Sequence, residues 1–433
     1  MKRVIPILLL LLLLPGCFMA SVEELLLAPK PPETYVELQP FIAGLLKQGY
    51  GYSAPLSGHN RQPIQIMDLG SGNEEAFVFL SQKGQPIRVC IYAKKEGVYE
   101  EICYIEEDSE SIDSVSYSDI DGDGLREILL GWRTGGLKSL SVYSYDGVSA
   151  VQRLQVDYDV HLIADLTGDG INDLVVLRQD AVSLTGLAEL YGQGKEDIEL
   201  LSAAPLSQGV ELITRVITGG LTDGKLAVLV ASQWNKDSTV TDIIAYRNGA
   251  LVNISLNEAT QVSDDNVRLY RMNAADINND GFIDIPRPVP LPVYAKEGQE
   301  GNYWCIEWCN YASTGEVVSV LYTYHNQQDG WYLELPDAWI GQITVTRLDA
   351  TPGERAIVFA LHAETPIDLL ILHTTTARDA SEADSRVVIG SHGDTTVLAS
   401  FPAGNNASYV PSVNRLTETL KWIHSDWITG EIS

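Results

Sequence analysis

The sequence has few basic residues. Its 29 Lys and Arg residues stand against 58 Asp and Glu residues, which gives a formal net charge of −29 at pH 7. Such acidity repels nucleic acid and offers no basic patch to an anionic membrane surface. Hydrophobic residues make up 45% of the chain, which argues against disorder. We therefore expect a folded protein that does not bind nucleic acid.

Cysteine is also scarce, with five in 433 residues. Cys90 and Cys103 flank a turn and are expected to lie about opposite each other in a hairpin. At that distance they could form a disulfide or remain two free thiols, and the sequence leaves both alternatives open. Cys305 and Cys309 would share one face of a strand but lie about 13 Å apart, too far for a disulfide. No His or second Cys pair has the spacing of a zinc site.

Known catalytic motifs are absent. The chain contains no G-x-S-x-G elbow, no H-E-x-x-H pair and no phosphate-binding glycine loop. Its seven histidines are scattered, and we interpret each of them as structural or surface-exposed. Carboxylates are plentiful, but nothing singles out an acid/base pair. The sequence therefore predicts no catalytic residue and favours a protein that is not an enzyme.

The N-terminus predicts export. A basic start is followed by an apolar run over residues 4–14, and Leu-Pro-Gly-Cys at 14–17 then resembles a lipobox. We expect residues 1–16 to be a lipoprotein signal peptide and Cys17 to be the lipidated first residue; ordinary cleavage beside an incidental cysteine is the alternative. The run is shorter than the ~20 residues of a spanning helix. The protein would be extracytoplasmic and anchored to the cell membrane by its lipid.

Residues 17–60 are expected to form a lipid-proximal linker and one short helix. The linker interpretation rests on the extended Lys-Pro-Pro at residues 30–32. The helix interpretation rests on apolar residues at helical intervals, namely Leu38, Phe41, Ile42, Leu45 and Leu46. Residues 61–433 are expected to form the main domain. Near its end, residues 415–427 suit either a short helix or a closing strand.

An acidic loop occurs three times in this domain, from Asp119, Asp165 and Asp276. Each copy has an oxygen-bearing residue at loop positions 1, 3, 5 and 9 and a glycine at position 6, which is the ligand spacing for a hard divalent cation such as Ca²⁺. The loops are not EF-hands, because no Glu stands at position 12. Acidic turns without a metal are the alternative.

The predicted Ca²⁺ ligands include the backbone carbonyl at position 7. They are Asp119, Asp121, Asp123, Leu125 and Glu127; Asp165, Thr167, Asp169, Ile171 and Asp173; and Asp276, Asn278, Asp280, Phe282 and Asp284.

Degenerate copies of the loop start near residues 68, 219 and 349, and strand-like segments rich in β-branched and aromatic residues lie between the copies. The spacing of about 46 to 73 residues leaves room for four short strands in each repeat. The sequence therefore predicts an all-β fold, a β-propeller of six to seven four-stranded blades with a short N-terminal helix.

The loops resemble the FG-GAP or VCBS repeats of integrin-α-type propellers and of many bacterial surface proteins, over roughly residues 60–400. The whole chain also resembles FG-GAP-type lipoproteins of Gram-positive, clostridia-like bacteria. This resemblance implies a propeller whose Ca²⁺ loops all lie on one rim, with a partner on the opposite rim. It implies no known reaction.

Two tryptophans are predicted to contact that partner. Trp132 and Trp234 would lie just after second strands, away from the Ca²⁺ rim, where exposed aromatic rings suit sugar or peptide contacts; packing between blades is the alternative. We therefore expect a Ca²⁺-stabilised binding or scaffold module for a glycan or protein. The alternatives are an extracellular hydrolase or lyase with its site in the propeller funnel, and a purely structural subunit of an envelope complex.

Overall fold

The structure is a computed structural model, and it describes residues 33–195, 197–268, 272–294, 303–348, 354–375 and 386–423. The predicted signal peptide and Cys17 lie outside these ranges, as does the degenerate loop from residue 349. The chain divides into two compact units, each described by itself. The first runs to Val115 and adds Trp132–Thr134 and Tyr145–Ala150; the second holds the other residues.

The first unit begins with helix α3 (Glu33–Lys47), which confirms the predicted N-terminal helix. Leu38 and Ile42 are fully buried, whereas Phe41 and Leu46 are about two-fifths exposed (39% and 37%). The buried pair packs with residues of β3 and β4, including Val78 and Cys90, in one hydrophobic cluster. The helix is therefore held by its apolar face, as the spacing of its apolar residues indicates.

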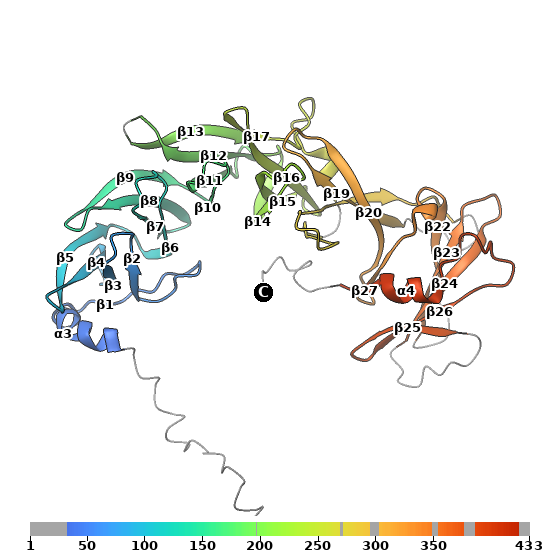
Figure 1. Cartoon of the computed structure of the whole chain (residues 1–433), viewed down its shortest axis with the longest axis horizontal. Coiled ribbons are helices and arrows are strands. Elements are labelled where there is room, and N and C mark those ends of the chain that lie inside the picture. Colours follow the sequence, from blue (N-terminus) through green and yellow to red (C-terminus); the bar gives the residue numbers. More distant parts are fainter. Residues whose placement is uncertain are drawn as a thin grey trace, which may run out of the picture. The chain divides into compact units, whose positions relative to one another are not determined.

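The described strands form six antiparallel sheets of four or five strands (Figure 1). The first sheet has the order β1 (Gly51–Tyr52), β3 (Glu74–Ser81), β4 (Ile87–Lys95) and β5 (Val98–Glu107), and β2 (Ile64–Asp68) also pairs with β3; the second has β6 (Ser111–Ser118), β7 (Glu127–Thr134), β8 (Leu137–Tyr145) and β9 (Ala150–Asp157). The third has β10 (Val160–Ala164), β11 (Asp173–Asp180), β12 (Thr185–Gln193) and β13 (Ile198–Pro205), and the fourth has β14 (Val210–Gly220), β15 (Leu226–Trp234), β16 (Ser238–Arg247) and β17 (Ala250–Asn253). The fifth has β18 (Ile285–Pro290), β19 (Trp304–Tyr311), β20 (Val317–Asn326), β21 (Trp331–Glu334) and β27 (Leu420–Trp422), and the sixth has β22 (Ile343–Leu348), β23 (Glu354–Leu361), β24 (Ile367–Thr375), β26 (Thr395–Ser400) and β25 (Val387–His392).

The connectivity of these sheets is that of propeller blades. Three of them are plain four-stranded meanders in which each strand pairs with the next along the chain. The second strand of each sheet is its apolar centre; in β11, for example, Leu174 to Leu177 are fully buried. The prediction of an all-β fold built from short antiparallel sheets is confirmed.

The C-terminal segment contains both of the predicted alternatives, a helix and a strand. Helix α4 (Val413–Thr419) is capped by Ser412, whose side chain accepts a hydrogen bond from the backbone N–H of Arg415. It leads directly into β27, which pairs with β21. Neither described helix has the length and apolarity needed to cross a bilayer.

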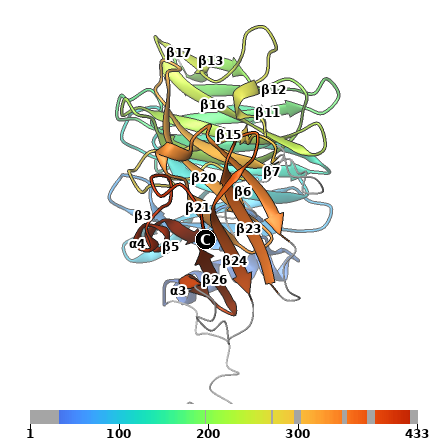
Figure 2. The same cartoon turned by 90° about the vertical axis from the view of Figure 1, so that its right-hand side faces the viewer.

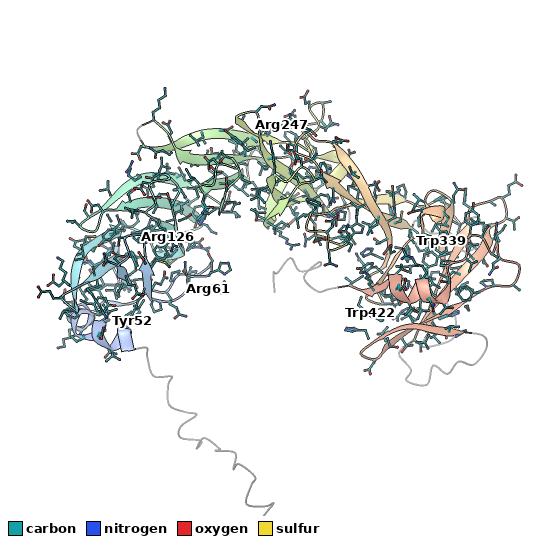
Figure 3. The ribbon with its side chains drawn as sticks, in the orientation of Figure 1. Tyr52, Arg61, Arg126, Arg247, Trp339 and Trp422 are labelled. Atoms are coloured by element: carbon teal, nitrogen blue, oxygen red, sulfur yellow. The ribbon has the colours of Figure 1, made fainter. Side chains whose placement is uncertain are left out.

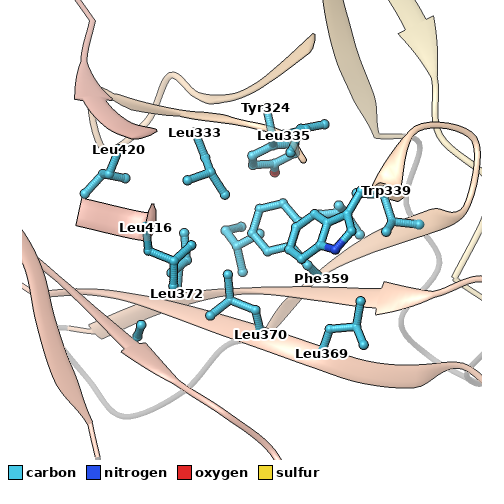
Figure 4. Close-up of a cluster of buried hydrophobic side chains, with 14 of the residues drawn as sticks. Tyr324, Leu333, Leu335, Trp339, Phe359, Leu369, Leu370, Leu372, Leu416 and Leu420 are labelled. Atoms are coloured by element: carbon cyan, nitrogen blue, oxygen red, sulfur yellow. The ribbon is translucent and has the colours of Figure 1, made fainter. Parts of the chain in front are cut away.

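A large hydrophobic cluster joins the last two sheets (Figure 4). Trp339, which follows β21 in the short 3-10 helix Asp337–Trp339, is fully buried (Figure 3) and packs on Phe359 of β23 with ring centroids 5.4 Å apart. Leu416 of α4 belongs to the same cluster. The indole N–H of Trp331 donates to the Thr374 hydroxyl at 2.9 Å, so polar contacts also fix β21 against β24.

The four described cysteines are free thiols. Cys90 is paired in register with Tyr104, and Cys103 with Ile91, so the two cysteines are one residue out of register rather than opposite each other. Because side chains alternate between the two faces of a sheet, this offset turns the two thiols apart. Of the two open alternatives, the structure has the free thiols.

Candidate functional site

The three acidic loops share one hydrogen-bond pattern. The first joins β6 to β7, the second joins β10 to β11, and the third leads into β18, the first strand of its sheet. The position 1 carboxylate accepts from the glycine N–H at position 6: Asp119 from Gly124 at 2.9 Å, Asp165 from Gly170 at 3.0 Å and Asp276 from Gly281 at 2.9 Å. The three glycines have φ of 88°, 90° and 90°. This is the left-handed region that glycine adopts without a Cβ penalty.

Positions 5 and 9 complete the pattern. The position 5 carboxylate accepts from the N–H of position 7: Asp123 from Leu125, Asp169 from Ile171 and Asp280 from Phe282. The position 9 carboxylate accepts from the N–H of position 2: Glu127 from Ile120, Asp173 from Leu166 and Asp284 from Ile277. The repeats predicted from the sequence are therefore built alike in the structure.

The position 9 carboxylates are buried. Glu127, Asp173 and Asp284 are 1%, 6% and 0% exposed. Burial, with further contributions from nearby loop carboxylates, raises the pKa of Glu127 and of Asp284 to about 7, and burial also raises the pKa of Asp173. A buried carboxylate beside other carboxylates is stabilised in its charged form by a cation.

The first loop brings three of its carboxylates together. Oxygens of Asp119, Asp121 and Glu127 all lie within 4.8 Å of one another, and this is the one such acidic group found in the described part of the chain. Oxygen donors of this kind suit a hard cation. In the other two loops position 3 is Thr167 or Asn278, which carries no carboxylate. The remaining predicted ligands, the position 7 carbonyls included, stay predictions.

The first and second loops also pack on each other. A Cβ placed on Gly122, whose φ is 79°, would lie 2.6 Å from Cδ1 of Ile171. The side chain of Asn172 donates to the Ser118 hydroxyl at 3.0 Å beside this contact. The position 7 side chain of the second loop, Ile171, therefore packs against the first loop.

The predicted partner contact at Trp132 is wrong. Trp132 lies inside β7, is 1% exposed and is one of the largest fully buried side chains in the described chain. Trp234, the last residue of β15, is partly exposed, packs against Gly209 and donates its indole N–H to the Gln208 carbonyl at 2.8 Å. Its role as a contact stays a prediction. The burial of Trp132 agrees with the stated alternative, packing between blades.

A Ser-His-Glu arrangement lies on the last sheet. Glu354 begins β23, His373 lies on β24 and Ser400 ends β26; β24 pairs with both other strands, and Figure 2 shows the three side by side. His373 is paired with Ala356 and with Leu398, two residues from Glu354 and from Ser400. Because side chains repeat every second residue on a face, all three functional groups share one face of the sheet.

Hydrogen bonds join the three side chains in sequence. His373 Nδ1 lies 2.8 Å from Glu354 Oε1, and His373 Nε2 lies 2.8 Å from Ser400 Oγ. Arg386 donates to the other carboxylate oxygen, Glu354 Oε2, at 2.8 Å. The hydrogen bonds from Arg386 and His373 outweigh the effect of burial and lower the pKa of Glu354. An ionised Glu354 can only accept, so the His373 proton sits on Nδ1 and Nε2 accepts from the Ser400 hydroxyl.

The electrostatics leave the imidazole able to act as a base. Burial of His373, which is 6% exposed, together with the nearby Arg386 charge, lowers its pKa below the ordinary value despite the bond to Glu354. The ring is therefore neutral at neutral pH. Ser400 is partly exposed, whereas His373 is buried. A nucleophile bonded to a base, which is bonded to an orienting carboxylate, is the arrangement used for acyl transfer.

No protein-family model matches the chain. No curated protein matches it with significance. Among solved structures it is similar to the exotype rhamnogalacturonan lyase YesX, at 12% identity over 75% of this chain and 74% of that chain, with a TM-score of 0.32. It is also similar to a rhamnogalacturonan lyase of Bacillus licheniformis, at 10% identity over 80% and 91%, with a TM-score of 0.32. A putative 6-phosphogluconolactonase of Bacteroides fragilis is similar at 11% identity over 72% and 85%, with a TM-score of 0.27.

The prediction of a binding or scaffold module is corrected by these neighbours, which are lyases and a putative lactonase. The likeness concerns the fold, and the substrates in these names belong to those proteins.

Proposed function

We propose that the protein is an extracytoplasmic hydrolase that cleaves an acyl bond with Ser400 as nucleophile and His373 as general base. Glu354 is the positioning residue that holds the imidazole in its productive tautomer. The observation that carries this proposal is the pair of 2.8 Å contacts on the two nitrogens of one buried imidazole.

The reaction follows from these contacts. Ser400 Oγ attacks the carbonyl carbon of the substrate while its proton passes to His373 Nε2. The proton is then given to the leaving oxygen or nitrogen as the old acyl bond breaks and an acyl-serine remains. A water molecule next gives a proton to Nε2 and attacks the acyl carbon. Ser400 Oγ leaves with that proton, so enzyme and proton count are restored.

Arg386 sets the strength of this base. Its guanidinium holds Glu354 in place but also places a positive charge near His373. The charge disfavours the imidazolium that forms during attack, so Arg386 both orders the site and lowers the pKa of the base.

The rest of the chain supports this activity as an exported, cation-stabilised scaffold. The sheets would be blades of an FG-GAP-type propeller of six or seven blades, and the three acidic loops would hold Ca²⁺ between their strands. Cys17 would carry the lipid that anchors the protein outside the cell membrane. The repeated hydrogen-bond pattern of the loops and the converging oxygens of Asp119, Asp121 and Glu127 support the cation sites.

The test is covalent labelling of the serine. A fluorophosphonate probe should form a bond between its phosphorus and Ser400 Oγ with loss of fluoride, and peptide mass spectrometry should find the label on Ser400 alone. Hydrolysis of p-nitrophenyl acetate should be measured in parallel. Ser400→Ala should lose both signals. Ser391→Ala is the matched control, because Ser391 is an exposed serine on β25 of the same sheet.

Two results would overturn the proposal. One is a labelling pattern in which Ser400 reacts no faster than Ser391. The other is an esterase rate that is equal in the two alanine variants. Either would assign the three side chains to packing and would favour the structural-subunit alternative. Melting curves of both variants establish that the comparison is between folded proteins.

A further inference from the structure

A cavity lies where β19 begins and β20 ends. Its volume is about 190 Å³. The walls include four ring-bearing residues, Tyr303, Trp304, Tyr324 and His325, together with Gln327 from the turn after β20. This volume is below the range of drug-sized sites, which is about 300–1,000 Å³. It therefore suits a single ring.

The described residues that line the cavity carry no Lys, Arg, Asp or Glu, in a chain where one residue in five (20%) is charged. The only titratable side chain with an ordinary pKa near neutrality is that of His325, which stacks on Tyr332 with ring centroids 5.1 Å apart and an interplanar angle of 10°. Burial lowers the pKa of His325 to about 3, so it is neutral as well. An ionic ligand would meet no counter-charge among these residues.

Several polar groups in the walls have no hydrogen-bond partner within the described part of the chain. They are the Tyr303 hydroxyl, the Trp304 indole N–H and the Gln327 amide. His325 adds a fourth: its Nε2 lies 2.9 Å from the Thr323 hydroxyl, but its buried Nδ1 has no partner. Tyr303 and Trp304 are partly exposed and Gln327 is exposed, so a bound ligand can reach their polar groups, whereas His325 Nδ1 is a buried atom for which a partner is expected.

We propose that this cavity binds one neutral pyranose ring. Aromatic faces pack against the C–H faces of a sugar, and the unpaired donors and acceptors suit its hydroxyl groups. A purely apolar aromatic ligand would fill the space but leave those groups unsatisfied. The site is separate from Ser400 and its partners, and its occupancy does not depend on hydrolysis.

Binding is measured in the Ser400→Ala protein, where no acyl transfer can occur. Methyl glycosides of glucose, galactose, mannose and xylose serve as probes, with ligand-detected NMR and tryptophan emission as readouts. At least one glycoside should bind saturably. Trp304→Ala should weaken that binding by roughly tenfold, the loss expected for one packed ring and one hydrogen bond.

Trp422→Ala is the matched control. Trp422, which Figure 3 labels, is a partly exposed tryptophan of the same unit. It contacts His392 and is not among the residues that line the cavity. Its variant should bind as the parent does. The inference is overturned if no glycoside binds saturably, if the two tryptophan variants are affected equally, or if phenol shows the Trp304 dependence and the sugars do not. If Ser400 proved not to be a nucleophile, these three binding results would still decide whether the cavity binds a sugar.

Discussion

Replacing Asp121 by Asn removes one of the three carboxylates that converge in the first acidic loop. The change is conservative for the loop itself. Asp121 Oδ1 accepts from the Asp123 N–H at 3.1 Å, and the amide oxygen of Asn can accept the same bond. The variant therefore removes a charge that a cation would need and keeps the turn. We expect the apo proteins to be similar in stability and the Ca²⁺-loaded proteins to differ.

The size of the difference follows from linkage. Ca²⁺ sites of extracellular modules have Kd values of about 10⁻⁴ to 10⁻³ M. At ~10 mM Ca²⁺ such a site stabilises the folded state by about 1.4 to 2.7 kcal/mol. Unfolding entropy of about 2.1 cal/mol/K for each residue gives about 0.9 kcal/mol/K for 433 residues. In a single cooperative transition, one site then raises Tm by about 1.5 to 3 °C.

The assay is calorimetric melting in chelator and in ~10 mM Ca²⁺. The native protein should gain the full increment from its first loop, and Asp121→Asn should lose most of it. Asp146→Asn is the matched control. Asp146 is an exposed acidic turn residue whose Oδ1 accepts from the N–H groups of Val148 and Ser149, without other converging carboxylates. Melting curves that respond to Ca²⁺ equally in both variants, or not at all in the native protein, would refute the reasoning.

Three further predictions concern the buried histidines and their partners. Ser400→Ala should lower kcat/KM for p-nitrophenyl acetate by about 10³-fold or more, in steady-state assays. The native rate should rise with pH through the His373 pKa, which lies below the ordinary value of about 6.5. In Arg386→Gln this limb should move to higher pH, because the positive charge that lowers the base pKa is gone; an unmoved limb would contradict that role. Burial lowers the pKa of His325 in the folded protein to about 3, whereas in the unfolded chain the ordinary value of about 6.5 applies. As the pH falls from about 6.5 toward 3, the imidazole is protonated in the unfolded chain but not in the folded one, so the free energy of unfolding decreases. Denaturant melts at pH 7 and pH 5 should show a smaller acid loss in His325→Phe than in the native protein.

The sheets were predictable because their signal repeats. The first two acidic loops each end one strand and start an apolar second strand, whereas the third leads into the first strand of its sheet, β18; in all three the sequence marks the start of a strand. The helix was predictable from its apolar spacing, and Leu38 and Ile42 are its buried pair. Cys90 and Cys103 were predicted to lie about opposite each other, but in the structure they are one residue out of register. A β-bulge between Ile91 and Tyr92 shifts this hairpin, and a bulge leaves no reliable mark in a single sequence.

The two candidate sites differ in how local they are. Each acidic loop lies within nine consecutive residues, so spacing alone revealed its carboxylates. Trp132 was misplaced because turn residues follow it, although β7 continues to Thr134 and buries the indole. The Ser-His-Glu arrangement was missed altogether. Its members are separated by 19 and 27 residues, and no short motif surrounds them.

The position of the three residues depends on strand register and strand order. His373 reaches Glu354 and Ser400 because β24 lies between β23 and β26. Each of these two residues is also two positions along its strand from the residue that pairs with His373. A shift of either strand by one residue would turn its side chain to the opposite face. The order of the last strands matters as well: β26, not β25, lies beside β24, although β25 comes first in the chain. A sequence that predicts each strand correctly therefore still does not predict this site. If the site were only packing, Ser400→Ala would remove one hydrogen bond and leave the pH dependence of hydrolysis unchanged, whereas a nucleophile at Ser400 requires the rate to follow the protonation of His373.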